Sequence, residues 1–115
     1  MNAPEPQASE IGPRQAAELV AAGAMLVDVR EPHERDAGYI DGSRHIELAD
    51  LASRAAEIDR DRPVIFQCRV GGRSAMATSA FRAAGYDAYN LTGGILAWVA
   101  AGLPIAPDGG HVADH

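Results

Sequence analysis

Short apolar runs alternate along this chain with stretches of helical spacing. A continuous apolar run is typical of a strand that is covered on both faces of a parallel sheet. We predict strands at residues 9–11, 24–29, 44–46, 63–66 and 87–91. Apolar positions that recur every three or four residues predict helices at 13–22, 48–58, 75–84 and 95–99, and 31–36 suits a short helical turn. This alternation of strands and helices predicts an α/β sandwich around a mostly parallel sheet.

The length of the chain bounds the number of domains. A chain of 115 residues suits one domain with its own core and is too short for two. We place that domain at residues 9–105 and expect it to be a monomer. The proline-containing lead-in at 1–8 and the glycine-containing tail at 106–115 are both expected to be flexible.

Charge and cysteine count exclude several classes of function. A formal charge of −6 argues against nucleic acid as the main partner. No apolar run approaches the length that spans a membrane, and the N-terminus lacks a signal-like apolar stretch. The single cysteine excludes an internal disulfide and offers no paired spacing for a metal site. We therefore expect a protein of the reducing cytoplasm that needs no metal and no other cofactor.

The strongest chemical signal lies between a predicted strand and the helix that follows it. The one cysteine, Cys68, stands where the strand ends. Gly71 and Gly72 let the turn point successive backbone N–H groups inward, where the helix dipole adds positive charge. Such an anion cradle stabilises a thiolate, and the charges of Arg69 and Arg73 act in the same direction. A lone cysteine is more often a small buried hydrophobe, but these neighbours favour a nucleophile.

Charged residues also follow the predicted strand at 24–29. Asp28, Arg30 and Glu31 stand at its end, at the sheet edge where open α/β folds bind their ligands. We interpret them as a structural ion network that holds the neighbouring loops. A direct part in the site is the alternative.

Four motifs follow one another in an order that characterises a known family. They are Leu26 to Glu31, Gly38-x-Ile40-x-Gly42, the loop Cys68-x-x-Gly71-x-Arg73-Ser74, and Gly93-Gly94-Ile95-x-Ala97-Trp98 with Gly102-Leu103-Pro104. Over residues 11–105 the chain resembles the single-domain form of the rhodanese, or sulfurtransferase, family. It departs from the family pattern at Tyr39, where His is frequent, and at 45–47. The resemblance implies a three-layer α/β/α sandwich whose five strands stand in the order 3-2-4-5-1.

The same resemblance implies a reaction. The thiolate of Cys68 would take the outer sulfur of thiosulfate or a related sulfane donor and become a persulfide. Backbone N–H groups of the loop would hold that sulfur, and Arg69 would bind the donor's oxyanion. The loop residues expected to bind the substrate are Arg69, Val70, Gly71, Gly72 and Arg73.

Other residues are expected to support the loop. Arg73 would brace it through Asp28 or Glu31, and Ser74 would support the cysteine at the start of the helix. The resemblance also implies that Asp28 and Arg30 support the site without performing the chemistry.

The sulfur acceptor is expected to come from outside the chain. With no second cysteine, the persulfide would pass its sulfur to a small thiol, a protein thiol or cyanide. The mouth of the loop is therefore expected to be open.

Two other functions fit parts of the pattern. A phosphatase or arsenate reductase of this fold would use a loop with five residues between cysteine and arginine, whereas Cys68 and Arg73 enclose four. A persulfide carrier or binding module, slow on free thiosulfate, would have the same loop and is distinguished only by its kinetics.

Overall fold

A computed structural model describes residues 9–114, so the predicted flexible lead-in at 1–8 lies outside the described residues. The fold is built on one five-stranded parallel sheet in the order β1-β5-β4-β2-β3. This order confirms the one that the family resemblance implies. The strands are β1 (Glu10–Ile11), β2 (Met25–Asp28), β3 (Arg44–His45), β4 (Val64–Gln67) and β5 (Ala88–Leu91).

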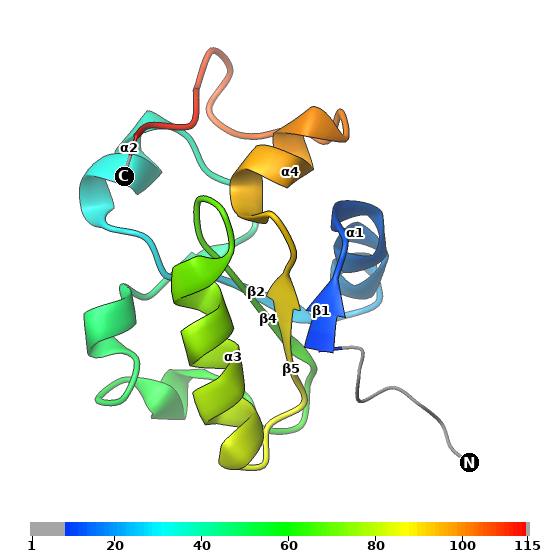
Figure 1. The fold of residues 1–115 in the computed structure, drawn as a ribbon, viewed down its shortest axis with the longest axis vertical. Helices are drawn as coiled ribbons and strands as arrows, with labels where there is room; N and C mark the ends of the chain where they lie inside the picture. Colours follow the sequence, from blue (N-terminus) through cyan, green and yellow to red (C-terminus); the bar gives the residue numbers. More distant parts are fainter. Residues whose placement is uncertain (1–8, 115) are drawn as a thin grey trace.

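Helices cover both faces of the sheet, which confirms the α/β sandwich (Figure 1). On one face α3 and two short 3-10 helices pack with the apolar residues of a first core. On the other face α1 and α4 pack with a second core, while α2 follows the C-terminal end of β2. The helices are α1 (Pro13–Ala21), α2 (Pro32–Ala37), α3 (Gly72–Ala83) and α4 (Gly94–Ala100), with 3-10 helices η2 (Leu48–Asp50) and η3 (Ala55–Glu57).

The central strand β4 contributes to both cores because successive side chains point to opposite faces. Phe66 and Cys68 belong to the core under α3, whereas Ile65 belongs to the core under α1 and α4. All of these residues are fully buried. The continuous apolar run of the sequence is thus explained by a strand that is covered on both sides.

The predicted continuous helix at 48–58 is wrong. The segment forms η2 and η3, separated by turns. It carries the chain from β3, at the edge of the sheet, to the start of β4, beyond β2. Between the two 3-10 helices the hydroxyl of Ser53 donates to the carbonyl of Asp50 at 3.1 Å, a local bond of the kind that competes with helical backbone hydrogen bonds. Leu51 and Ile58 still reach the core, which explains the apolar spacing.

The described part of the C-terminal tail, residues 106–114, packs back onto the domain. The backbones of Ala106 and Tyr39 exchange two hydrogen bonds of 2.7 and 2.8 Å. The N–H of His111 donates to the carbonyl of Ala37 at 2.9 Å. In Figure 1 this segment returns to lie beside α2. The flexibility of the tail stays a prediction, but the structure gives it contacts that the sequence did not indicate.

Candidate active site

The loop that follows β4 encloses the side chain of Cys68. The chain passes from Gln67 through residues 68–71 and enters α3 at Gly72. Gly71 has a φ of 106°, a left-handed conformation that favours glycine. The predicted turn from strand into helix is therefore present, and its first glycine supplies the backbone conformation.

Hydrogen bonds converge on the sulfur of Cys68. The N–H of Gly71 donates to Sγ at 3.1 Å, and Oγ of Ser74 lies 3.3 Å from it. Burial raises the pKa of the thiol, but hydrogen bonds from the Ser74 hydroxyl and from the N–H groups of Ser74, Gly71 and Arg73 outweigh it, so the pKa is lowered. The hydrogen bonds to the sulfur thus favour the thiolate, as the predicted cradle of backbone N–H groups requires, and the arginine charges are not among the main causes.

The first turn of α4 holds the carbonyl groups of the loop. The N–H of Ile95 donates to the carbonyl of Cys68 at 2.9 Å, and the N–H of Leu96 donates to that of Arg69 at 3.2 Å. These are N–H groups that have no partner within their own helix. Because the loop carbonyls are bound on this side, its N–H groups are free to face the sulfur. Sequence analysis recognised the glycines before this helix but missed this contact.

Gly94 permits that approach. A Cβ at this position would lie 2.5 Å from the carbonyl oxygen of Cys68 and closer still to that of Arg69. Its φ of 63° is also left-handed. The position therefore excludes any side chain for two independent reasons.

We expect Gly94→Ala to destabilise the fold by about 3 kcal/mol, because it combines left-handed strain with a backbone clash. Gly102→Ala is the matched control, since Gly102 has a φ of 82° and nothing within 4 Å of its Cβ position. Only the conformational cost, about 1 kcal/mol, applies there. Denaturant unfolding of both variants measures the difference. Equal losses would mean that the loop moves aside without cost.

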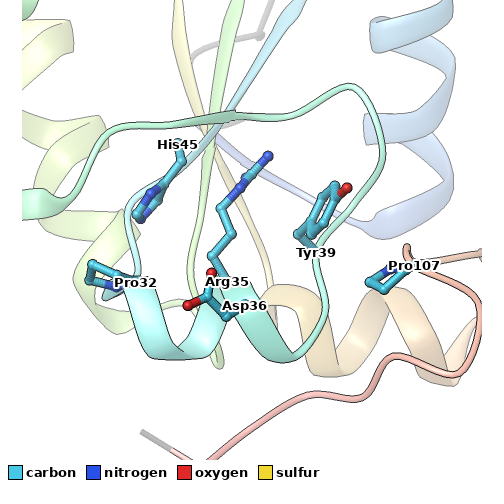
Figure 2. Close-up of a pocket in the computed structure, with 6 residues that line it drawn as sticks. All are labelled: Pro32, Arg35, Asp36, Tyr39, His45 and Pro107. Carbon is cyan, nitrogen blue, oxygen red and sulfur yellow. The ribbon is translucent and has the colours of Figure 1, made fainter.

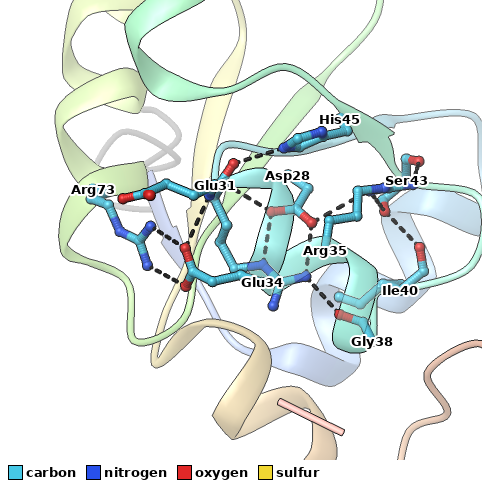
Figure 3. Close-up of polar contacts among 10 residues, drawn as sticks. Asp28, Glu31, Glu34, Arg35, Gly38, Ile40, Ser43, His45 and Arg73 are labelled. Carbon is cyan, nitrogen blue, oxygen red and sulfur yellow. Dashed lines mark hydrogen bonds and ion pairs between the residues drawn. The ribbon is translucent and has the colours of Figure 1, made fainter. Parts of the chain in front are cut away.

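Arg73 and Glu34 form a bidentate ion pair between α3 and α2 (Figure 3). Nη1 and Nη2 of the arginine donate to the two carboxylate oxygens at 2.7 and 2.9 Å. The side chain of Glu34 has no exposed surface. Arg73 is therefore held by α2, as a brace for the loop requires, and its hydrogen-bonded partner is Glu34 in place of the expected Asp28. The charge of Glu31, the other expected partner, also helps to raise the pKa of Arg73.

The carboxylate of Glu34 is strongly stabilised. Burial raises its pKa, but the hydrogen bond and charge of Arg73, the backbone N–H of Glu31 and the charge of Arg30 lower it to about 2. Glu34 also accepts from the N–H of Glu31 at 3.0 Å, which closes a capping box at the start of α2. Sequence reasoning missed Glu34. The available signal was Glu31-Pro32-x-Glu34, an acidic capping pattern with proline in the first turn.

Asp28 and Arg30 form an ion pair whose two side chains are fully buried. Nε and Nη2 of Arg30 donate to the two oxygens of Asp28 at 2.9 Å each, and Nη2 also donates to the carbonyl of Gly38 at 2.8 Å. Arg35 donates to the same carboxylate at 3.3 Å. None of these contacts reaches Cys68. The geometry matches the interpretation as an ion network, in which Glu31 has the exposed N-cap position of α2.

The loop was expected to be open above Cys68, but it covers the thiol. The side chain of Arg69 is 28% exposed and its guanidinium lies 3.5 Å from the carboxylate of Asp114. Val70 is exposed, whereas Cys68 has no exposed surface. The predicted open mouth above the thiol is therefore absent, because the residues around Cys68 cover it completely. A reagent reaches the sulfur only when side chains of the loop move.

A pocket of about 490 Å³ lies away from this loop. Figure 2 shows Arg35 rising from α2 between His45 and Tyr39, with Pro32, Asp36 and Pro107 completing the lining. Nε2 of His45 lies 2.7 Å from the carbonyl oxygen of Arg30, so this ring nitrogen is hydrogen-bonded to the residue that also pairs with Asp28.

Within residues 9–114 no group of three or more His, Cys, Asp or Glu side chains is placed to hold a metal ion. No described helix is both long and apolar enough to cross a bilayer.

Comparison with known proteins gives a consistent result. The pattern of the rhodanese-like domain matches residues 12–101. A Pseudomonas aeruginosa (strain LESB58) protein named thiosulfate sulfurtransferase GlpE is 39% identical over 89 residues, covering 76% of this chain and 81% of its own length. An Allochromatium vinosum protein named sulfurtransferase is 41% identical over 87 residues, covering 74% and 81%. The crystal structure of a rhodanese-related protein from Thermoplasma volcanium has a TM-score of 0.79 at 30% identity, covering 84% and 96%.

Proposed function

Because this chain belongs to the rhodanese-like domain family, we propose that it is a sulfurtransferase that moves a sulfane sulfur through a persulfide on Cys68. The donor is thiosulfate or a related anion, and the acceptor is a thiol or cyanide. The observation that carries the proposal is the sulfur of Cys68, held by loop hydrogen bonds that lower its pKa. A reduced lone cysteine also suits the cytoplasm.

The first half-reaction forms the persulfide. The Cys68 thiolate attacks the outer sulfur of thiosulfate, and a new S–S bond forms to that atom. The bond between the outer sulfur and the sulfite sulfur breaks, and its electron pair leaves with sulfite. Arg69 is the candidate for the sulfonate oxygens because its side chain is partly exposed at the loop and, among residues 9–114, its ion pair is a 3.5 Å contact with the exposed Asp114.

The second half-reaction returns the thiolate. An acceptor thiolate or cyanide attacks the terminal sulfur, and the electron pair of the S–S bond returns to Cys68. The acceptor comes from outside, because Cys68 is the only cysteine of the chain. The loop N–H groups stabilise the Cys68 thiolate as it leaves, through the same hydrogen bonds that lower the pKa of the thiol.

Intact mass tests the proposal. Incubation with thiosulfate is expected to add the mass of one sulfur atom, and dithiothreitol is expected to remove it. A mass unchanged by thiosulfate or by any other sulfane donor contradicts the persulfide. Phosphate-ester hydrolysis is the contrasting assay, and we expect none, because Cys68 and Arg73 enclose four residues, one fewer than the loop of a phosphatase of this fold.

A persulfide carrier is the second candidate, and the full burial of Cys68 favours it. A partner that displaces the loop side chains would load the cysteine faster than free thiosulfate does. The two functions differ in the rate of loading by a cysteine desulfurase relative to thiosulfate. Faster loading by thiosulfate supports the enzyme, and faster loading by the partner supports the carrier.

The contact between Arg69 and Asp114 is expected to weaken donor binding. A sulfonate and the carboxylate compete for one guanidinium, so Asp114→Asn should lower the KM for thiosulfate and Arg69→Ala should raise it. Both effects should shrink at high salt, because Asp114 is fully exposed. Steady-state kinetics at two ionic strengths measure them. Asp108→Asn is the control, an exposed carboxylate of the same segment; an equal effect there would indicate general charge only.

A further inference from the structure

The hydroxyl group of Ser74 stands between two acceptors. Its oxygen lies 3.3 Å from Sγ of Cys68 and 2.6 Å from Oδ1 of Asn90. A serine hydroxyl has one hydrogen, so it donates to only one of these atoms at a time. The sulfur and the amide oxygen therefore compete for the same hydrogen.

The orientation of Asn90 decides the competition in the resting protein. Its Nδ2 faces both carboxylate oxygens of Glu10, at 3.0 and 3.1 Å, and the carbonyl of Gly71 at 3.2 Å. These atoms only accept, so the NH₂ side of the amide points at them and Oδ1 points at Ser74. An amide oxygen carries no hydrogen, and the 2.6 Å contact therefore requires the hydrogen of Ser74.

We propose that Asn90 is a positioning residue for Cys68, which holds the Ser74 hydrogen in the resting thiol state and yields it to the sulfur when the thiolate forms. This inference rests on the proposed function. In the thiol state Ser74 offers a lone pair to the S–H group. On ionisation the thiol proton leaves to solvent, and the hydroxyl rotates about its C–O bond toward the sulfur.

This arrangement sets how much of the cysteine is ionised at rest. Rotation of the hydroxyl leaves the buried Oδ1 of Asn90 without a donor, which costs free energy. The N–H groups of the loop favour the thiolate without this cost, so Asn90 opposes them through Ser74. Among residues 9–114, the charged groups around the sulfur include Arg69 and Arg73 on the loop and α3, Glu34 on α2 behind Arg73, Glu31 at the start of α2 through its charge on Arg73, and Glu10 on β1 behind Asn90.

The experiment measures the thiol pKa of Cys68 from the pH dependence of iodoacetamide alkylation. We expect Asn90→Ala to lower that pKa, because the Ser74 hydrogen then has no competing acceptor. A merely structural role predicts the opposite, since a loosened loop would turn its N–H groups away from the sulfur. A pKa that is unchanged or raised overturns the inference. Asn90→Leu fills the space that alanine leaves and serves if the first variant does not fold.

A double-mutant cycle with Ser74→Ala completes the test. We expect Ser74→Ala to raise the thiol pKa more in the Asn90→Ala background than in the wild type, because only there is the hydroxyl free for the sulfur. Equal changes in both backgrounds overturn the competition. Thr92→Ala is the control, because its hydroxyl meets Glu10 at 2.9 Å and not Ser74, and it should leave the pKa in place. Alkylation needs no donor, so a failure of sulfur transfer is a separate result.

Discussion

Replacing Cys68 with serine is expected to remove sulfur transfer completely. Serine keeps the size of the side chain, but a hydroxyl remains protonated in a cradle that ionises a thiol and cannot form a persulfide. No other cysteine can take its place, because the chain has one. We expect neither the added mass after thiosulfate nor any turnover above the rate without protein.

The loss of activity is informative only if the Cys68→Ser variant remains folded. Cys68 lies in the core under α3, so the variant should be compared with wild type by melting temperature and circular dichroism. Wild-type protein blocked with iodoacetamide is a second control, because it removes the thiol without a mutation. Sulfur transfer that persists in a folded Cys68→Ser protein would contradict the persulfide mechanism.

Arg73→Ala is expected to destabilise the fold by about 3 kcal/mol, the lower end of the range for a buried pair that loses one partner, because Arg73 itself is 20% exposed. The carboxylate of Glu34 would remain without a charged hydrogen-bond partner and without exposed surface. The loop would also lose its link to α2, so we expect the rate of persulfide formation to fall. Denaturant unfolding and single-turnover loading measure the two effects.

The chain offers a matched control for this substitution. Arg54 also meets a glutamate with two nitrogens, at 2.8 and 2.9 Å from Glu57, but both side chains are partly exposed. Arg54→Ala should therefore change the unfolding midpoint little. Arg73→Ala combined with Glu34→Leu should recover much of the loss. No recovery would mean that the arginine acts through contacts other than Glu34.

Acid should reduce the difference between wild type and Arg73→Ala. The pKa of Glu34 falls from an ordinary 4.5 to about 2 in the folded protein. A carboxylate whose folded pKa is depressed stabilises the fold above its unfolded pKa and loses that contribution as pH falls toward the folded value. The contribution of the pair is thus complete above about pH 4.5 and is lost toward pH 2. A difference in stability that does not shrink over this range would contradict the assignment.

Much of the site could be predicted because its signals are local. The cysteine, the glycines of the turn and the arginine at the helix start lie within seven consecutive positions, 68–74. A strand followed by a helix places backbone N–H groups at the turn whatever the rest of the chain does. The partners of these residues were predicted less well. Arg73 pairs with Glu34, which is 39 positions away, and Ser74 donates to Asn90, which is 16 positions away.

The sequence by itself determined the layered α/β architecture and the position of the nucleophile, because apolar runs, glycines and one cysteine act through their own chain neighbours. The family resemblance added the strand order. Only the tertiary structure decided which groups hold the loop. The first turn of α4 binds its carbonyl groups, Glu34 pairs with Arg73, and Asn90 accepts the hydrogen of the Ser74 hydroxyl. It also decided that 48–58 is not one helix and that Cys68 is enclosed. Such contacts depend on which elements the folded sheet brings side by side. The spacing of apolar residues within one segment does not indicate which distant segment will pack against it.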